Sequence, residues 1–391
     1  MNRILVILLV SSVISLQCGN PFRAVEDNII TANRWSEEKA RSWYAEIPWL
    51  VGCNFIPSTA INQLEMWQSN TWDPATIDKE LAMAARLGFN LIRVYLHDLA
   101  YQQDPDGFLK RIDTFLSIAE KHGIRVMLVI FDDCWLAYPE SGKQPEPLPG
   151  VHNSGWLESP GMPALKKYPN DKLVRRRLET YVKAVLQRFK SDERVLIWDL
   201  YNEPGGIWYK RGEGGKKFEN GAIGELCLPL LNDVYIWARE VSPEQPITSC
   251  FYGRKESVKA ATKWADIITF HNYSDAQALA KMINDLKKYN RPIICSEYMA
   301  RHTKSTFLGC LPVMKKEKVG AVNWGLVAGK SNTIYPWASW EKPGVTPEPR
   351  IWFHDILRKD GSAFDHKEVE FIRAIAGPEI EAQQENSTDK K

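Results

Sequence analysis

The sequence lacks a strong excess of charge of either sign. Its 391 residues include 50 Lys and Arg against 48 Asp and Glu, which leaves a formal net charge of +2. A chain so close to neutral has no strong field to gather nucleic acid or an anionic membrane surface. We therefore expect no nucleic-acid partner and look for a neutral ligand.

Cysteines are few, and their spacing is not that of a metal site. The chain has seven, without a CxxC pair or the Cys/His pattern of a zinc site. No spacing supports a disulfide between Cys227 and Cys310. Four other cysteines lie in apolar runs or at their ends, where a thiol packs as a small hydrophobic group: Cys53, Cys134, Cys250 and Cys295.

Long apolar runs are missing beyond the first residues, so we expect no membrane span. Residues 1–18 join a charged start, Met1-Asn2-Arg3, to a short apolar run, which is typical of a signal peptide. Two outcomes stay open: plain cleavage, and a lipid anchor on Cys18 as in a bacterial lipoprotein. Gln17 departs from the small residue that precedes such a cysteine. We expect a secreted, periplasmic or cell-surface protein.

Short apolar runs alternate with amphipathic stretches from residue 50 onward, which is the pattern of a parallel sheet with helical crossovers. Eight runs are predicted strands: residues 50–56, 90–96, 125–131, 195–202, 246–252, 267–273, 292–299 and 321–327. Predicted helices lie near 74–87, 107–122, 172–189, 223–241, 257–264, 276–289, 306–318 and 367–376. Eight strands with eight helices favour a single closed (β/α)₈ barrel over an open sheet.

The chain divides by composition into a signal segment, residues 1–18, and three further parts. Residues 19–48 are expected to cap the barrel bottom, residues 49–377 to form the barrel, and residues 378–391 to be a polar disordered tail. Two loops, 132–170 after the third strand and 328–350 after the eighth, are far longer than barrel closure requires. Long loops in compact domains are usually functional. The oligomeric state is left open.

Two carboxyl groups end two of the predicted strands. The apolar run 195–201 leads into Asn202-Glu203-Pro204, and the run 292–296 leads into Glu297. The carboxyl ends of barrel strands meet at one mouth, where barrel active sites are assembled. Two carboxyls there are the minimal apparatus for cleaving a glycosidic bond, because one protonates the leaving oxygen while the other attacks or activates water. Asn-Glu-Pro by itself is usually a helix start, so the interpretation depends on this pairing.

These residues, in this order along the chain, resemble glycoside hydrolase family 5, within the clan of retaining (β/α)₈ glycosidases. The resemblance covers residues 49–377 and implies that Glu203 is the acid/base and Glu297 the nucleophile. It requires no metal or other cofactor. It extends to four further positions at strand ends: Arg93, His271, Tyr273 and Trp324.

Each of these positions has an expected physical role. Arg93 and Tyr273 would stabilise the carboxylate of Glu297, and Asn202 would bond the sugar 2-hydroxyl. Glu203 is expected to have a raised pKa, so that it stays protonated at working pH. Trp324 would form the floor under the reacting sugar.

Other polar and aromatic residues near strand ends are weaker candidates for sugar contact. His97 and Asp132, with their neighbours Asp98 and Asp133, end the second and third strands. The first long loop carries Trp135, whose flat face suits a sugar ring. In the second loop, Trp337 and Trp340 either contact sugar or anchor the loop.

The third predicted strand departs from the family pattern. Family 5 enzymes commonly have a histidine at its end, whereas this chain has Phe131-Asp-Asp-Cys134. Hydroxyl recognition is therefore expected to differ from that of the common cellulases.

The expected substrate is an oligosaccharide or polysaccharide. The segments 52–67 and 93–98 look like a branch of the family that includes exo-β-mannosidases acting on short β-mannosides such as Manβ1,4-GlcNAc. Walls raised by the two long loops would turn an open cleft into a pocket. An endo-β-1,4-glycanase (xylanase, mannanase or glucanase) is the alternative. A catalytically inactive carbohydrate-binding barrel is a third hypothesis, which the retention of both carboxyls opposes.

Overall fold

The computed structural model describes residues 29–206, 208–212, 215–218, 225–250, 255–341 and 347–377; for 208–212, 215–218 and 255–256 only the backbone is described. The predicted signal peptide 1–18, with Cys18, and the predicted tail 378–391 lie outside these residues. Within the described part, no helix is long and apolar enough to span a membrane.

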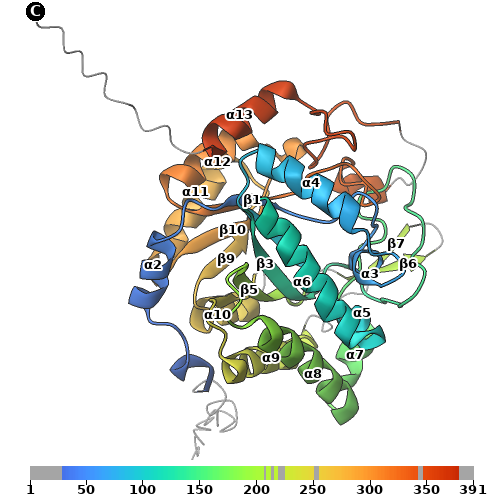
Figure 1. Ribbon diagram of the computed structural model, residues 1–391, viewed down its shortest axis with the longest axis vertical. Helices are drawn as coiled ribbons and strands as arrows, with labels where there is room; N and C mark the ends of the chain where they lie inside the picture. Colours follow the sequence, from blue (N-terminus) through green and yellow to red (C-terminus); the bar gives the residue numbers. More distant parts are fainter. Residues whose placement is uncertain are drawn as a thin grey trace, which may run out of the picture.

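Eight parallel strands form the centre of the molecule (Figure 1), and this confirms the predicted barrel. Their order in the sheet is β8-β5-β3-β2-β1-β11-β10-β9. A side chain at Gly52 would place its Cβ 1.6 Å from the carbonyl oxygen of Leu91, so this close strand contact requires glycine. The strands are β1 (Val51–Asn54), β2 (Leu91–Tyr95), β3 (Arg125–Asp132), β5 (Val195–Asn202), β8 (Ile247–Thr248), β9 (Ile268–His271), β10 (Ile293–Glu297) and β11 (Gly320–Trp324).

Hydrogen bonds between the two end strands bring the sheet round into a nearly closed barrel. The backbone N–H of Asp266 donates to the carbonyl of Ile247 (2.9 Å). The hydroxyl of Thr248 donates to the carbonyl of Ile267 (3.1 Å) and lies 3.0 Å from the hydroxyl of Thr269. The short strand β8 is thus held by side-chain as well as backbone bonds, and covers less than the predicted 246–252.

Amphipathic helices surround the barrel (Figure 1). Many begin with a local cap, as at Asp73, whose carboxylate accepts the Thr76 N–H before Pro74 opens the helix. The main helices are α4 (Pro74–Arg86), α6 (Pro105–Lys121), α8 (Lys172–Phe189), α9 (Leu228–Val241), α10 (Lys255–Lys263), α11 (Ala276–Leu286), α12 (Phe307–Lys316) and α13 (His366–Ala376). Shorter elements are α3 (Gln63–Trp67), α5 (Asp98–Gln103), η2 (Lys287–Tyr289), η3 (Arg301–Thr303) and η4 (Trp337–Trp340).

The N-terminal ends of the strands are covered by helix α2 (Glu37–Ala45) and the segment after it. Trp43, Tyr44 and Ile47 pack against buried residues at the strand starts, among them Leu50 and Leu91. Apolar contact at this end seals the barrel and leaves the opposite end for loops.

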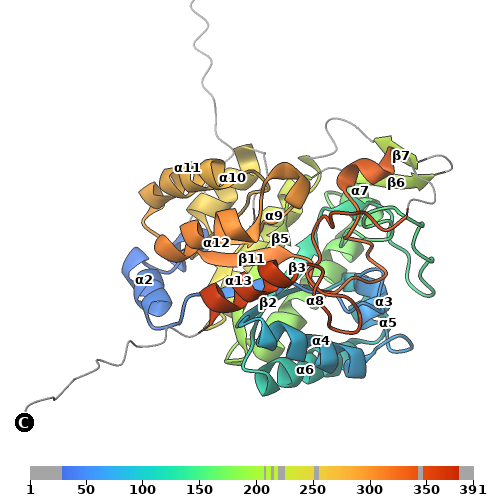
Figure 2. The same ribbon diagram turned by 90° about the horizontal axis from the view of Figure 1, so that it is seen from above.

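The opposite end carries the long connections (Figure 2). The loop after β3 contains β4 (Trp135–Leu136) and α7 (Met162–Lys167). The chain after β5 forms a hairpin, β6 (Trp208–Gly212) and β7 (Gly215–Phe218), whose first strand pairs with β4. We did not predict this hairpin from the sequence, where only a helix from residue 223 was expected. The sequence feature that could have indicated this hairpin is the glycine-rich stretch between two short runs of residues.

Candidate active site

Glu203 and Glu297 meet at the carboxyl ends of their strands. Glu203 directly follows β5, and its φ of +43° lies in the left-handed region that non-glycine residues rarely adopt. Glu297 is the last residue of β10. One carboxylate oxygen from each lies, with Nδ1 of His271, in a group of atoms all within 4.8 Å of one another. The structure therefore brings together the two carboxyls that the sequence paired.

The carboxylate of Glu297 is held by three donors. Its Oε1 accepts hydrogen bonds from the hydroxyl of Tyr95 (2.7 Å) and from Nη1 of Arg93 (3.1 Å). Its Oε2 accepts one from the hydroxyl of Tyr273 (2.8 Å). Burial raises the pKa of both tyrosines, which keeps them protonated as donors. These bonds stabilise an ionised, oriented carboxylate.

Arg93 lies fully buried at the centre of this network. Its Nη2 is 2.7 Å from Oδ2 of Asp199 and donates to Oδ1 of Asn202 (2.6 Å). Its Nη1 donates to Oδ1 of Asn54 (2.8 Å). The guanidinium fork therefore ties strands β1, β2, β5 and β10 to one another through their polar side chains.

Asp132 supports Asn202 rather than facing the site opening. Its Oδ1 accepts a bond from Nδ2 of Asn202 (2.9 Å), and its Oδ2 accepts one from Nε1 of Trp156 (2.8 Å). The residue is 1% exposed, and burial raises its pKa well above the ordinary value. His97 is also fully buried and caps α5 through the N–H of Leu99. Both side chains are buried, and the sugar contact expected of them stays a prediction.

The carboxylate of Glu203 is engaged at both oxygens. Oε1 lies 2.6 Å from Nδ1 of His271, and Oε2 accepts a bond from the thiol of Cys134 (2.9 Å). Burial by itself would raise the pKa of Glu203, but the bonds from His271 and Cys134 and the positive charges of His271 and Arg93 outweigh it and lower the pKa. The expectation of a raised pKa is therefore wrong for the unliganded protein. Cys134 is a hydrogen-bond donor here, not merely the packing group that we expected.

The remaining described cysteines follow the sequence interpretation. Cys53, Cys250 and Cys295 are buried and form no disulfide. Cys227 and Cys310 are not joined by a disulfide either. The fold is therefore held without a disulfide among its described cysteines.

Aromatic side chains line the surroundings of the carboxyl pair. Trp324, at the end of β11, packs edge-on against Tyr95 and Trp156, with ring centroids 5.8 and 5.2 Å apart. Trp337 contacts Tyr273 edge-on at 5.1 Å. The half-buried Trp135 lies parallel to Trp340 at 6.2 Å, so it anchors a wall of the site rather than standing alone.

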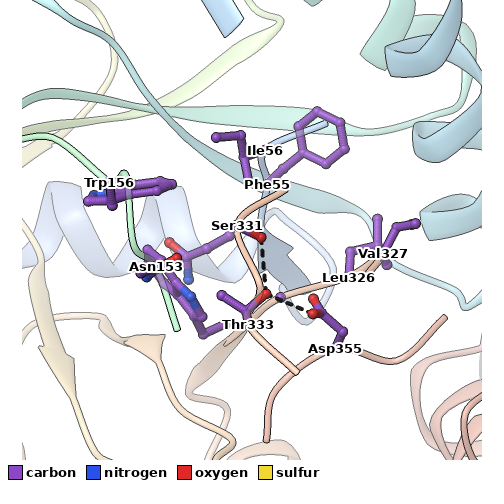
Figure 3. Close-up of a pocket in the computed structure, with 12 residues that line it drawn as sticks. Phe55, Ile56, Asn153, Trp156, Leu326, Val327, Ser331, Thr333 and Asp355 are labelled. Atoms are coloured by element: carbon purple, nitrogen blue, oxygen red, sulfur yellow. Dashed lines mark hydrogen bonds between the residues drawn. The ribbon is translucent and has the colours of Figure 1, made fainter. Parts of the chain in front are cut away.

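A small cavity of about 20 Å³ adjoins Trp156 and Trp324. This volume fits about one water molecule. Figure 3 shows Asn153 on one side, from the loop after β3, and Thr333 on the other, from the chain after β11. Thr333 donates to Oδ2 of Asp355 (2.7 Å), whose pKa burial raises to about 6. The cavity marks the seam where the two long loops meet.

Sequence reasoning missed three residues of this centre. Tyr95 lies two positions after Arg93 and is therefore on the same face of β2. This spacing could have identified Tyr95 as a residue of the site. Asp199 lies three residues before Asn202 inside an apolar run, where a charge requires a partner. No feature of the sequence distinguishes Trp156 from the other tryptophan of its loop, Trp135.

A (β/α)₈ barrel with two adjacent carboxyls at the carboxyl ends of its strands is the arrangement that glycoside hydrolysis requires. The model of the cellulase family, glycosyl hydrolase family 5, matches residues 55–331. The chain therefore belongs to family 5, as the resemblance implied.

Individual relatives are more distant. Mannan endo-1,4-β-mannosidase A of Emericella nidulans is 29% identical over 96 residues, which are 25% of this chain and 22% of that protein. Among solved structures, the GH5_18 protein of Streptomyces cattleya in complex with GlcNAc has a TM-score of 0.54 and 12% identity, over 83% of this chain and 79% of that one. An exo-β-1,4-mannosidase of Opitutaceae bacterium strain TAV5 has a TM-score of 0.52 and 16% identity, over 84% and 59%. Such likenesses establish the fold.

Proposed function

We propose that this family 5 glycosidase is a retaining, exo-acting β-mannosidase for short β-mannosides such as Manβ1,4-GlcNAc. Glu297 is the nucleophile and Glu203 the acid/base. The observation that carries the exo assignment is the interlocking of the two long loops beside the carboxyl pair.

In the first step, an oxygen of Glu297 attacks the anomeric carbon while the bond to the leaving oxygen breaks. That oxygen takes a proton from Glu203, which leaves a glycosyl ester on Glu297. Arg93, Tyr95 and Tyr273 hold the attacking carboxylate in place. Asn202, fixed by Arg93, is placed for the 2-hydroxyl.

The proton for this step has a source in the site. Nδ1 of His271 and Oε1 of Glu203 are 2.6 Å apart, so a proton carried on Nδ1 is within direct reach of the carboxyl. When a leaving oxygen enters, transfer from His271 to Glu203 restores the acid. In the second step Glu203 deprotonates water, which attacks the anomeric carbon and frees Glu297.

The distance between the carboxyls supports retention. Retaining glycosidases hold the two groups roughly 5–5.5 Å apart, whereas inverting enzymes need about 6.5–9.5 Å to admit a water molecule. One carboxylate oxygen of Glu203 and one of Glu297 lie within 4.8 Å of each other, which is compatible with the shorter class.

Contacts between the two long loops support a pocket. The N–H of Asn153 donates to the carbonyl of Ser331 (2.8 Å), and the N–H of His152 donates to the hydroxyl of Ser339 (3.0 Å). The amide of Asn332 donates to the carbonyl of Leu148 (3.0 Å). Loops tied to each other form one continuous wall, and a wall across one end of a cleft admits only a terminal sugar.

The names of the relatives include both exo-acting and endo-acting enzymes, and these two modes of action have to be distinguished. One solved structure shows a GH5_18 variant of Streptomyces cattleya in complex with Manβ1-4GlcNAc, with a TM-score of 0.53. The similar curated relatives are instead mannan endo-1,4-β-mannosidases. An endo-β-mannanase is accordingly the second candidate.

The test is a substrate panel. We expect p-nitrophenyl β-mannoside and Manβ1,4-GlcNAc to be hydrolysed faster than the β-xyloside and β-glucoside, and mannose to be the only product from mannooligosaccharides. The Glu297→Ala variant serves as the inactive negative control. A rapid fall in the viscosity of mannan, or in that of xylan or carboxymethylcellulose, would instead assign endo action.

A further inference from the structure

We propose that Cys134 is a positioning residue for the acid/base, because its thiol donates a hydrogen bond to Oε2 of Glu203 and thereby governs how readily that carboxyl keeps its proton. The inference rests on the role proposed for Glu203. It assigns a role to one residue of the segment 131–134, where this chain departs from the family pattern of a histidine at the end of the third strand.

The thiol is the donor in this bond while Glu203 is ionised. Burial, together with the neighbouring carboxylates of Glu203 and Asp132, raises the pKa of Cys134 well above the ordinary value for a thiol. A protonated thiol has one hydrogen to give, and Oε2 of Glu203, 2.9 Å away, accepts it.

A backbone hydrogen bond holds Cys134 next to Asp132. The backbone N–H of Cys134 donates to Oδ1 of Asp132 (3.1 Å). The same carboxylate is fixed by Asn202 and by Trp156. The backbone of Cys134 is therefore tied into a chain of buried hydrogen bonds, and its sulfur also lies 4.0 Å from Nδ2 of Asn202.

The groups that face Glu203 come from four strands and the turn that carries Cys134. His271 on β9 and Cys134 after β3 bond it directly. Arg93 on β2 acts on it through its charge. The carboxylates of Asp132 on β3 and Glu297 on β10 lie close by. Among the described side chains, Cys134 and His271 are the two that bond the carboxylate of Glu203 directly.

Loss of this donor has a defined direction. A hydrogen bond donated to a carboxylate stabilises the anion, so its removal favours the protonated acid. Activity that needs the acid would then persist to higher pH. In Cys134→Ser a hydroxyl donor remains, and the change should be smaller than in Cys134→Ala.

The experiment compares pH profiles of kcat/KM for the full chain and its variants. With Manβ1,4-GlcNAc, whose leaving group needs protonation, we expect Cys134→Ala to move the alkaline limb upward by about one pH unit, the size expected for one hydrogen bond to a charged group. Cys134→Ser should move it less. Cys310→Ala, which removes a buried thiol of α12, is the matched control and should leave the limb in place.

A second measurement tests the role of Cys134 independently of the proposed mannosidase activity. NMR titration of side-chain ¹³C-labelled glutamate reads the ionisation of Glu203 without any substrate, with Glu203→Gln to assign the signal. An upward shift in Cys134→Ala supports the proposal even if no mannoside is cleaved. An unmoved Glu203 signal, or equal shifts in Cys134→Ala and the Cys310→Ala control, would overturn it.

Discussion

Asp199 and Arg93 form an ion pair with both side chains fully buried, and Nη2 lies 2.7 Å from Oδ2. The same Arg93 donates to Glu297, so Asp199 acts on the nucleophile through one intermediate residue. A charge buried in this way is stable only while its partner stays in place.

We therefore expect Asp199→Asn to lower both stability and turnover. Removal of one partner of a buried pair costs about 3–5 kcal/mol, and kcat should fall at least about tenfold because Arg93 is no longer oriented. Urea unfolding and steady-state kinetics measure the two effects.

Asp266→Asn is the control, since Asp266 pairs with Arg239 (2.8 Å) in a second buried ion pair. It should cost stability and leave the kcat of folded enzyme unchanged. Equal loss of kcat in both variants would contradict the positioning role.

The two catalytic glutamates should differ when each is replaced by alanine. Glu297→Ala should abolish turnover of all substrates, whereas Glu203→Ala should still react with aryl mannosides whose leaving groups need no protonation. In Glu203→Ala the intermediate accumulates, and added azide should restore product release. Stopped-flow and steady-state assays with and without azide test this, and failure of azide to rescue Glu203→Ala would remove its assignment as acid/base.

The configuration of the first product reports the mechanism directly. If the reaction passes through the proposed covalent intermediate on Glu297, the anomer released first should be β. Proton NMR of a fast reaction, recorded before mutarotation, distinguishes the anomers. An initial α-anomer would exclude retention.

A chelator should leave activity unchanged, since neither step uses a metal. The cluster of Glu203, His271 and Glu297 has ligand atoms at a spacing that a cation can bridge. We expect dialysis against EDTA to have no effect on kcat. A loss that added Zn²⁺ or Ca²⁺ restores would assign this cluster as a metal site instead.

Stability should fall as the pH rises through neutrality, and Glu80 is one cause. Burial raises its pKa from 4.5 to about 7, although the Ser58 N–H bonds its carboxylate. A folded-state pKa above the unfolded value means that this stability is fully present below about pH 4.5 and is lost as the pH rises through 7. The difference in unfolding free energy is about 3 kcal/mol at most. Glu80→Gln should flatten the dependence between pH 5 and 8 in urea unfolding, and Glu120→Gln, at an exposed position of α6, should not.

Strand ends were the most predictable part of the site. A buried strand that finishes in polar residues has few alternatives in a barrel, so the sequence alone places Asn202-Glu203 and Glu297 at one mouth. His97 and Asp132 end strands too, but only the fold shows that both are buried, with Nδ1 of His97 capping α5 and Asp132 bonded to Trp156 and Asn202. Cys134 is indistinguishable from a packing thiol in the sequence, because only the fold brings it to Oε2 of Glu203.

The sequence by itself determined the alternation of strands and helices, the pair of carboxyls and the family, because hydrophobic periodicity and strand-end chemistry are local properties of the chain. The tertiary structure decided which polar groups meet across strands and how the loops interlock. It also decided the ionisation of Glu203, where two donors outweigh burial. Such quantities depend on distances between residues far apart in the chain, and no local pattern encodes them.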